Sequence, residues 1–349
     1  MEQASMRAAA YFECGGPEVI QIIEAPRPQV RPGEALVQVK ACALNHMDLW
    51  SLYGPADESY TFPFWGGADI AGVVAELGPG VEGFKPGQRV LVNPSLYCGR
   101  CEYCIAGEES LCVSYGILGG DRRGGLAEYV AVGADSLMAF PDRMSFEEAA
   151  AVPLVFQTAW RALVTQAKVR AGEDVLVLGG SGGVATAAIQ IAQLAGARVF
   201  AITSSAEKVR KALELGADFA FDRQREDAWA IIAELTGGRG VDVVVENVGA
   251  KTWGESLKAL AKGGRLVTYG RTTGRMAETN ISMVFWNQLH LIGSTMSNRK
   301  EFAEVMRLIF QGRLQPVIDS VFPFERTAEA YTRLAKGEQF GKIVIKITA

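Results

Sequence analysis

The sequence has no long block of basic residues and no apolar segment at its N-terminus. Its net charge is −4, which argues against nucleic acid as the main partner, because binding to a phosphate backbone needs a basic surface. Residues 1–7 lack the hydrophobic core of a secretory signal, so we expect a cytoplasmic protein. Internal repeats and low-complexity segments are also lacking.

Charge is absent from residues 175–197, a stretch long enough to be considered as a membrane span. Five glycines interrupt it, however, and its pattern divides into a short strand followed by a helix. A soluble domain explains this stretch better, and we expect no membrane partner.

With 349 residues, 49% of them hydrophobic and 21% charged, the chain is long enough for two domains with separate cores. The first 140 residues contain short strands separated by Gly and Pro turns, which is typical of a β-barrel or sandwich. The clearest strands are expected at 36–41, 72–77 and 88–92.

From Ser145, where a capping box opens an alanine-rich helix, strands alternate with helices. Such alternation predicts an α/β fold with a parallel sheet covered on both faces. We expect strands at 175–178, 198–203, 219–222, 241–246, 265–269 and 289–293, with helices at 184–195, 205–215, 227–235 and 252–261. Two further helices, Lys300–Phe310 and Thr327–Ala335, precede a last strand, Lys342–Ile347, which we expect to return to the first domain.

A glycine-rich turn follows the strand at 175–178. Gly180-x-Gly182-x-x-Ala185 matches the dinucleotide-binding fingerprint G-x-G-x-x-G/A, and it stands between a strand and a helix as the fingerprint requires. The first glycine permits a tight turn, the second lets the backbone approach a pyrophosphate, and the small third residue lets the helix pack on the strand. The N–H groups at the start of the helix, around Gly183 and Val184, then point at the phosphates.

Four of the six cysteines form the pattern C-x2-C-x2-C-x7-C, at Cys98, Cys101, Cys104 and Cys112. In a chain without a secretory signal this spacing indicates a metal site rather than disulfides. Four thiolates suit tetrahedral zinc and leave no open position for a substrate, so the zinc would be structural. An iron–sulfur cluster and a metal-free loop are the alternatives. The long last spacing, without a following proline, favours zinc over iron–sulfur.

With these two motifs, the chain resembles the medium-chain dehydrogenase/reductase superfamily over nearly its whole length. The cysteine lobe resembles the structural zinc lobe of its alcohol dehydrogenases. The segments similar to its quinone oxidoreductase branch are 43–48, 246–249, 262–267 and 340–344.

The resemblance implies two domains. Residues 1–155 would form a GroES-like, β-rich catalytic domain with a zinc lobe at 95–115. Residues 156–294 would form a Rossmann domain with a doubly wound, six-stranded parallel sheet that binds the cofactor. Residues 295–349 would return to complete the catalytic domain.

Zinc alcohol dehydrogenases of this superfamily hold a second, catalytic zinc with Cys, His and Cys ligands. The resemblance places these ligands at Asn45, Ala68 and approximately Leu154, none of which is a usual zinc ligand. A carboxylate is kept at Asp69, but one carboxylate does not make a tetrahedral site. We therefore predict one structural zinc and no catalytic metal.

Without a metal, a conjugated enone or quinone suits hydride transfer better than a saturated ketone. Its conjugated system spreads the charge, so that hydrogen-bond donors suffice. This predicts an NADPH-dependent reductase of quinones or α,β-unsaturated carbonyls. One alternative is an alcohol dehydrogenase whose second zinc uses Asp69, His46 or Cys42; another is a non-catalytic NADPH-binding protein.

Candidate catalytic residues are Asn45, His46 and Thr158, with Tyr53 as a further donor. The resemblance places Asn45 beside the nicotinamide and Thr158 against its ring. His46 matches a position that contacts the cofactor pyrophosphate; proton donation and a plain buried histidine are the alternatives. His290, in an apolar strand, is expected to be structural.

Further cofactor-binding positions follow from the same resemblance. Asp69 and Lys342 match an acid–base pair near the cofactor phosphates, although an ordinary surface charge is almost as good an explanation for Lys342. Asn247 and Gly270 complete the set that we assign to the cofactor.

The strand at 198–203 predicts which nicotinamide is used. NAD-selective Rossmann folds place an acidic residue there to bond the ribose, whereas this strand is followed by Ser204 and Lys208, with Arg223 after the next strand. A hydroxyl and cations suit a 2′-phosphate, so we expect NADPH, with NADH less favoured. Asp222 argues in the other direction if it faces the adenosine. Solvated surface charges are the alternative for Lys208 and Arg223.

The strand at 289–293 lies where relatives pair their sheets across a two-fold axis. We therefore expect a homodimer, or a tetramer built from dimers. The substrate is expected to be a small carbonyl, enone or quinone.

Overall fold

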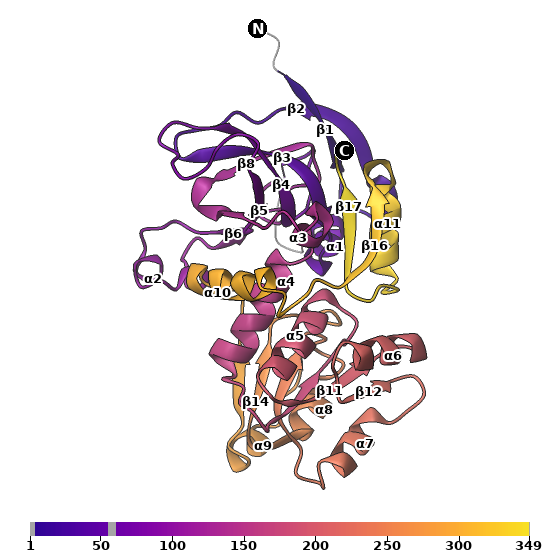
Figure 1. The fold of residues 1–349 in the computed structure, drawn as a ribbon. Helices are drawn as coiled ribbons and strands as arrows, with labels where there is room; N and C mark the ends of the chain where they lie inside the picture. The colour runs from indigo at the N-terminus through magenta and orange to yellow at the C-terminus, as the bar shows by residue number, and fades with distance from the viewer. Residues whose placement is uncertain (1–3, 55–60, 349) are drawn as a thin grey trace. The chain divides into compact units, whose positions relative to one another are not determined.

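The computed structural model describes residues 4–54 and 61–348. The chain divides into two compact units, Met1–Leu154 with Asn298–Ala349, and Val155–Ser297 (Figure 1). Among the described residues, no helix has both the length and the apolar character needed to cross a membrane.

The first unit is built around a seven-stranded sheet. Its order is β16-β17-β3-β4-β5-β9, with β8 paired to β3. The strands are β3 (Glu34–Ala43), β4 (Asp69–Leu77), β5 (Arg89–Val92), β8 (Tyr129–Gly133), β9 (Leu137–Ala139), β16 (Ile318–Pro323) and β17 (Lys342–Lys346). The C-terminal strand β17 pairs antiparallel with β3, so a strand near the end of the chain adjoins one from its first fifty residues (yellow beside indigo in Figure 1).

Alternating apolar residues of these strands form the core of the first unit, together with helices α1 (His46–Tyr53) and α11 (Thr327–Ala335). Ser145 caps α3 (Phe146–Ala150) through a capping box with Glu148, as the sequence predicts. A hairpin, β1 (Ser5–Ala10) and β2 (Gln21–Pro26), packs its apolar side on the same core. This unit also contains β6 (Ser95–Leu96), α2 (Glu102–Ile105), β7 (Gly116–Ile117), α10 (Arg299–Phe310) and several short 3-10 helices.

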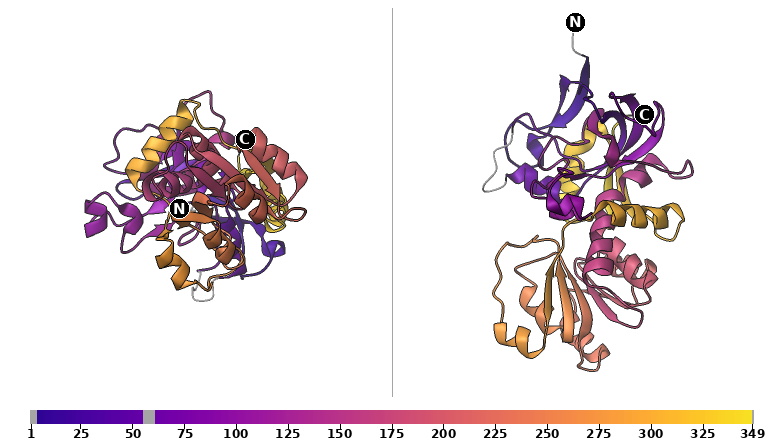
Figure 2. Two further views of the ribbon diagram at one scale, coloured as in Figure 1. Left: turned by 90° about the horizontal axis from the view of Figure 1, so that it is seen from below. Right: turned by 90° about the vertical axis from the view of Figure 1, so that its left-hand side faces the viewer.

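The second unit contains a six-stranded, fully parallel sheet in the order β12-β11-β10-β13-β14-β15. Its strands are β10 (Asp174–Val177), β11 (Arg198–Thr203), β12 (Phe219–Asp222), β13 (Val241–Glu246), β14 (Leu260–Thr268) and β15 (His290–Gly293). Figure 2 shows helices flanking the sheet on both faces. They include α4 (Pro153–Trp160), which leads into the unit, α5 (Gly183–Leu194), α6 (Ala206–Glu214), α7 (Ala228–Leu235), α8 (Trp253–Lys258) and α9 (Ile281–Trp286). The order reverses direction at β10, where doubly wound folds bind their ligands.

The second unit differs from the sequence-based expectation in its last part, where helix α9 was not expected. Strand β14 begins at Leu260, where the chain already pairs with Val241, so α8 ends earlier than predicted. Strand β15 is the edge of the sheet and is largely exposed. The side chain of His290 is therefore exposed, whereas we expected a structural role. As an edge strand, β15 has a neighbouring strand, β14, on one side alone within the described sheet.

Candidate functional site

The glycine-rich turn lies at the carboxyl end of β10. Three of its glycines, Gly179, Gly180 and Gly182, differ in backbone conformation and in the space around them. Gly179 takes the left-handed conformation, with φ of +58°, so the tight turn belongs to it and not to Gly180. A Cβ on Gly180 would lie 3.2 Å from side-chain carbons of Ala201 and Thr203, so Gly180 permits close packing on β11. A Cβ on Gly182 would meet only the Gly179 carbonyl oxygen, at 3.5 Å, which leaves space above the turn.

Helix α5 starts at this turn with its N-terminal N–H groups available to an anion. Gly182 is its N-cap, without a side-chain hydrogen bond, and its first turn has no acidic residue. The N–H groups at Gly183 and Val184 therefore form the kind of site that binds a phosphate group. Ala185 is fully buried, as the third position of the fingerprint requires.

The other residues predicted to bind the cofactor in this unit follow the carboxyl ends of parallel strands, so they share one edge of the sheet. Ser204 follows β11, Asn247 follows β13, and Gly270 comes shortly after β14. At this edge the Oδ1 of Asn247 and the hydroxyl of Tyr269 are buried without a partner among the described residues. Unpaired buried polar atoms at a binding edge fit a bound ligand. Tyr269 was not predicted as part of the site, because a tyrosine at the end of a strand is equally expected in a hydrophobic core.

Polar contacts form within the segments that follow β11 and β12 at this edge. Lys208 is largely buried, and its Nζ donates to Ser204 Oγ at 3.4 Å. The carboxylate of Asp222 accepts from the backbone N–H of Gln224 at 3.0 Å, and Arg225 lies 3.8 Å from its other oxygen. Asp222 is thus engaged by its own loop.

Arg223 follows β12 directly. Its backbone N–H donates to the carbonyl of Thr203 at the end of β11, at 3.2 Å, and its side chain is exposed. Thr158 lies on α4, where its buried hydroxyl donates to the sulfur of Met296 at 3.5 Å. The roles of Arg223 and Thr158 toward a cofactor stay predictions.

In the first unit, Asp48 organises the start of α1. Its carboxylate accepts from the backbone N–H of Asn45 at 2.7 Å and from that of Gly67 at 2.8 Å. Complete burial raises the pKa of Asp48 to about 6, although both hydrogen bonds act against this rise. Asp48 therefore ties Asn45 to the loop that precedes Asp69.

Asn45, Asp69 and Lys342 form a buried cluster. The Nζ of Lys342 donates to Asp69 Oδ2 at 2.8 Å, to Asn45 Oδ1 at 2.6 Å and to the Leu44 carbonyl at 2.7 Å. Asn45 Nδ2 donates to Asp69 Oδ2 at 2.9 Å. Asp69 Oδ1 accepts from the backbone N–H of Leu154 at 2.6 Å. The side chains of Asp69 and Lys342 are 0% and 3% exposed, so this is an interior ion pair.

This cluster bears directly on two predicted roles. An ammonium group has three N–H donors, and Lys342 uses all of them inside the cluster, so none is left for a cofactor phosphate. An ordinary surface charge, the alternative for Lys342, is wrong, because the side chain is buried. Asn45 is equally engaged, since its Oδ1 faces the ammonium and its Nδ2 faces Asp69.

His46 and Tyr53 lie on α1 with more exposed side chains. The imidazole of His46 meets the ring of Trp50 edge-on, with centroids 5.3 Å apart. Desolvation lowers the pKa of His46, so it is neutral at neutral pH. His46 thus keeps part of its side chain accessible, and its roles toward a cofactor stay predictions.

The positions that correspond to a catalytic zinc site do not fit that metal. Ala68 is fully buried and offers a methyl group, and Leu154 contributes only its backbone N–H to the cluster. Asn45 Oδ1 and Asp69 Oδ2 both face the Lys342 ammonium. Zinc sites use thiolate, imidazole or carboxylate ligands that surround the metal ion. Here the ammonium group of Lys342 lies between the two side-chain oxygens.

The cysteine lobe does fit a metal. The Sγ atoms of Cys98, Cys101, Cys104 and Cys112 lie within 4.8 Å of one another, and no disulfide joins them. A hydrogen bond from the Cys98 backbone N–H lowers the pKa of Cys112 to about 6, whereas desolvation raises the pKa of Cys104 to about 12. A bound cation would stabilise all four as thiolates, and four thiolates suit structural zinc.

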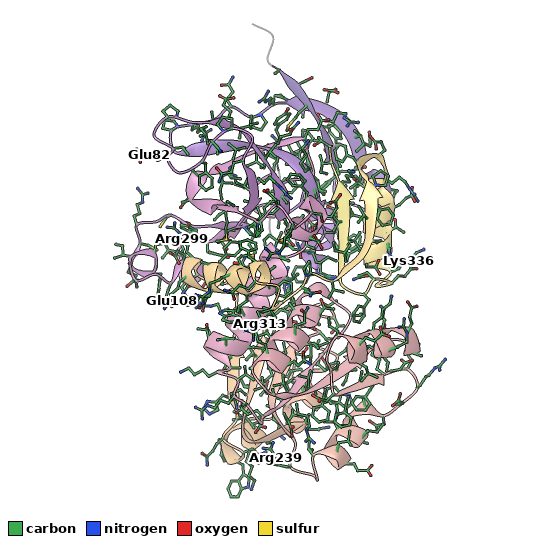
Figure 3. The ribbon with its side chains drawn as sticks, in the orientation of Figure 1. Glu82, Glu108, Arg239, Arg299, Arg313 and Lys336 are labelled. Atoms are coloured by element: carbon green, nitrogen blue, oxygen red, sulfur yellow. The ribbon has the colours of Figure 1, made fainter. Side chains whose placement is uncertain are left out.

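The lobe is anchored through its acidic residues to the start of α10. Glu109 accepts from the backbone N–H of Arg299 at 3.2 Å, and Glu108 accepts from the side chain of Asn298 at 3.5 Å. Figure 3 labels Glu108 and Arg299, which lie on these two segments. These contacts join the cysteine lobe, in the first third of the chain, to the C-terminal segment of the first unit.

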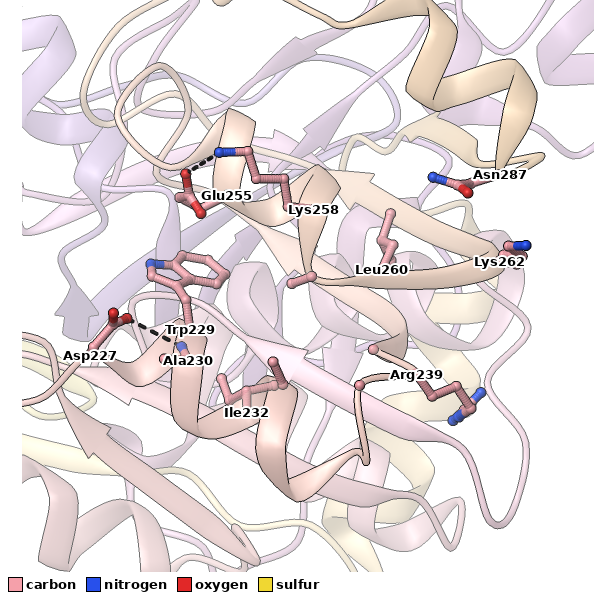
Figure 4. Close-up of a pocket in the computed structure, with 14 residues that line it drawn as sticks. Asp227, Trp229, Ala230, Ile232, Arg239, Glu255, Lys258, Leu260, Lys262 and Asn287 are labelled. Atoms are coloured by element: carbon pink, nitrogen blue, oxygen red, sulfur yellow. Dashed lines mark hydrogen bonds and ion pairs between the residues drawn. The ribbon is translucent and has the colours of Figure 1, made fainter.

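A cavity of about 690 Å³ opens on the second unit at the amino ends of the strands (Figure 4). Leu260 begins β14 there, and Asn287 precedes β15. Three of its charged side chains form ion pairs within the protein: Lys258 contacts Glu255 at 2.8 Å, and Arg239 contacts Asp242 at 2.7 Å. This cavity is at the edge opposite the glycine-rich turn, so it is separate from the candidate cofactor site.

Two family models match the chain. The alcohol dehydrogenase GroES-like domain matches residues 31–142, and the zinc-binding dehydrogenase model matches residues 183–311. An alcohol dehydrogenase of Geobacillus stearothermophilus is 34% identical over 345 residues, which cover 98% of this chain and 100% of that protein. The chain belongs to the medium-chain dehydrogenase/reductase superfamily. The predicted family and fold class are confirmed.

Other members of the superfamily that resemble the chain have different names. A crotonyl-CoA reductase of Streptomyces avermitilis is 32% identical, covering 93% of this chain and 81% of that protein. A human quinone oxidoreductase is 30% identical, covering 98% of both. The chain is therefore an oxidoreductase of this superfamily, and its relatives do not agree on a substrate.

Solved structures agree with the fold. A structure described as an NAD-dependent alcohol dehydrogenase is 44% identical, with a TM-score of 0.94, covering 98% of this chain and 100% of that one. A crotonyl-CoA carboxylase/reductase, AntE, in complex with NADP is 25% identical, with a TM-score of 0.92, covering 99% and 95%.

Proposed function

We propose that the protein is an NADPH-dependent oxidoreductase that transfers hydride to a quinone or an α,β-unsaturated carbonyl without a catalytic metal. The proposal depends on one observation: the groups at Asn45, Ala68 and Leu154, the positions that correspond to the catalytic zinc ligands, are not zinc ligands. They offer an engaged amide, a methyl group and a backbone N–H in place of three metal ligands.

The choice of acceptor follows from what such a site can stabilise. A metal acting as a Lewis acid contributes several kcal/mol to polarising a saturated carbonyl, which neutral hydrogen-bond donors replace only in part. An enone or quinone spreads the incoming charge over its conjugated system. The names of two relatives, a quinone oxidoreductase and a crotonyl-CoA reductase, describe acceptors of this kind and support the proposal.

The cofactor would supply the hydride, and residues of this chain would hold it. Gly182 and the start of α5 would receive the pyrophosphate, and Asn247 and Tyr269 would offer their unpaired polar atoms at the same edge of the sheet. Cys98, Cys101, Cys104 and Cys112 would hold one structural zinc.

NADPH is favoured over NADH by the adenosine end of the site. Ser204 and Lys208 are paired there, and the carboxylate of Asp222 is engaged by its own loop. The hydroxyl of Ser204 and the cationic side chains of Lys208 and Arg223 suit a 2′-phosphate. An NADH preference is the competing outcome, since a 44% identical structure is described as NAD-dependent.

A steady-state assay tests the proposal, with NADPH or NADH as donor and a quinone, an enone and a saturated ketone as acceptors. We expect turnover of the quinone or the enone, with kcat/KM for NADPH at least about tenfold above that for NADH. Metal analysis of the same preparation should give one zinc per chain. Activity restricted to simple alcohols and ketones, with two zinc ions bound, would contradict the proposal.

Alcohol dehydrogenase activity is the second candidate, favoured by the names of several relatives. It needs a second metal site, for which the sequence suggested Asp69, His46 or Cys42. Cys42 is fully buried, and desolvation raises the pKa of its thiol well above the usual value, which opposes metal binding. Asp69 is committed to Lys342.

We further infer a homodimer, or a tetramer built from dimers, through the edge of the second unit. Strand β15 is the edge strand of the described sheet, so the backbone N–H and C=O groups on its outer side can pair with a strand of another chain. The neighbouring α9 exposes Ile281, Phe285 and Trp286, at 75%, 63% and 76%. Large exposed apolar side chains beside a free edge are typical of an oligomer interface.

A further inference from the structure

We propose that Glu246 is a positioning residue of the cofactor site. Its buried carboxylate fixes the turn at 247–249, so that the Asn247 amide contacts the nicotinamide half of the dinucleotide. This inference rests on the dinucleotide binding proposed above. It adds a residue that acts through Asn247 and does not itself touch the cofactor.

Glu246 is the last residue of β13, and its side chain is fully buried at the carboxyl edge of the parallel sheet. Its Oε1 accepts from the backbone N–H groups of Val248 at 2.7 Å and Gly249 at 3.0 Å. Its Oε2 accepts from the hydroxyl of Ser256 at 2.6 Å and from that of Thr252 at 3.0 Å. Burying a carboxylate costs free energy unless donors replace its water, and these donors do so. The carboxylate therefore fixes the turn that follows the strand.

A second set of contacts fixes the same turn from the loop after β14. The carbonyl of Asn247 accepts from the backbone N–H and the hydroxyl of Thr272, at 3.2 and 3.0 Å. The carbonyl of Val248 accepts from the same two groups of Thr273, at 2.8 and 2.7 Å. The turn is thus bound from the sheet and from the loop. Its one polar side chain, the Asn247 amide, is left for a ligand.

The Asn247 amide lies against the glycine-rich turn. A Cβ on Gly179 would lie 3.1 Å from its Oδ1 and 3.4 Å from its Nδ2, so the amide occupies the space beside Gly179. A Cβ on Gly270 would lie 3.2 Å from the Cβ of Asn247, so Gly270 leaves room for this side chain. Asn247 Oδ1 is buried without a partner among the described residues. An unpaired acceptor in this place suits a donor on a ligand.

The order of the strands indicates which part of the dinucleotide meets this amide. Ser204 follows β11 on one side of β10, and the pyrophosphate site is at the start of α5, after β10 itself. Asn247 follows β13 on the other side of β10. Doubly wound folds bind one mononucleotide half on each side of this switch point. With the adenosine at Ser204, the nicotinamide half faces Asn247, whose oxygen accepts from an N–H or O–H of that half.

Calorimetric titrations of Glu246→Gln and Asn247→Ala test the proposal. Gln keeps the shape of the side chain but replaces charge-assisted hydrogen bonds by weaker neutral ones, so the turn must be ordered when the cofactor binds. We expect the Kd for NADPH to rise about tenfold in each variant. The Kd for 2′-phospho-ADP-ribose, which lacks the nicotinamide half, should change little. In the double variant the Kd for NADPH should equal that of Asn247→Ala, because Glu246 acts through Asn247.

Glu173→Gln is the matched control. Glu173 precedes β10 and binds Arg265 through two hydrogen bonds, of 2.9 and 2.8 Å, at the amino edge of the same sheet. Both Glu246→Gln and Glu173→Gln should lower Tm by a few degrees, because each weakens a polar network of the second unit. Glu173→Gln should leave the Kd for NADPH and for the fragment unchanged.

Hydrogen exchange of the wild-type protein decides even if Glu246→Gln does not fold. The backbone N–H groups of Val248 and Gly249 should be protected in the cofactor-free protein, because the Glu246 carboxylate already binds them. Adding NADPH should change their exchange little. Protection that appears only with NADPH would show that the cofactor orders this turn, and would overturn the proposal.

Two results of the titrations would also overturn it: equal rises of the Kd for NADPH and for the fragment in Glu246→Gln, or additive effects in the double variant. The titrations contain no acceptor, so they are separate from the test of the reaction. Alcohol oxidation with two zinc ions contradicts the proposed function and not this inference. A wild type that prefers NADH contradicts the proposed cofactor choice, and NADH with ADP-ribose then gives the same comparison.

Discussion

At the scale of single residues, the burial of Asp48 makes the first unit sensitive to pH. Its folded-state pKa of about 6 lies above the ordinary value of 3.8, so the folded protein binds this proton more tightly than the unfolded chain. The contribution of Asp48 to stability therefore grows as pH falls from above 6 towards 4, by at most about 3 kcal/mol, and is lost as pH rises through 6.

Asp48→Asn should remove this pH dependence. The variant loses one of the two N–H acceptors, so it should be less stable than the wild type, with the larger deficit at pH 4.5 and the smaller one at pH 7.5. Urea unfolding of both proteins at the two pH values measures this. Glu82→Gln, at an exposed position, is the control and should give equal shifts at both values. A deficit of Asp48→Asn that is the same at both pH values would contradict the assignment.

Two glycines of the turn should respond differently to the same added methyl group. Gly182→Ala adds a Cβ to open space, so Tm should change little while the Kd for NADPH rises about tenfold, because the methyl group displaces the pyrophosphate. Gly180→Ala presses on Ala201 and Thr203 and should lower Tm. Thermal unfolding and fluorescence titration separate the two effects. Unchanged NADPH affinity in Gly182→Ala would place the cofactor elsewhere.

At the scale of elements, the sequence predicted best what depends on neighbours along the chain. The strands of the parallel sheet are short, mostly apolar segments rich in β-branched and aromatic residues, and β11, β12 and β13 agree with prediction residue for residue. Helix α9 was missed, because it is only six residues long and most of its large apolar side chains, Ile281, Phe285 and Trp286, are exposed, so it has no clear core-facing pattern. The pair of Asp69 and Lys342 was expected only from the family resemblance, since 273 positions separate the two residues and no local pattern joins them. The hydrogen bond from Lys342 to Asn45 was not predicted.

The folded structure of the cysteine lobe should depend on its bound zinc. Cys112→Ser should lose the zinc and lower Tm by several degrees, since a closed site contributes its binding energy to folding. Metal analysis together with thermal unfolding tests this. Cys14→Ser, at an exposed cysteine outside the cluster, should retain both zinc and stability. Full stability of metal-free Cys112→Ser would show that the lobe does not need zinc.

At the scale of the whole molecule, assembly should depend on the exposed edge of the second unit. Trp286→Glu places a charge on α9, so sedimentation velocity should show a shift towards the mass of one chain. Val321→Glu, at an exposed position of the first unit, should leave the mass unchanged. A wild-type protein that already sediments as a single chain would contradict the proposed dimer.

The pairing of β17 with β3 has a consequence for biosynthesis. During translation Asp69 leaves the ribosome long before Lys342, which is 273 positions later. Until then the carboxylate lacks its ammonium partner, and β3 lacks one neighbour in the sheet. The second unit, continuous from Val155 to Ser297, is complete before that moment. A nascent chain stalled before residue 342 therefore contains all the strands of the parallel sheet, whereas the sheet of the first unit still lacks β17.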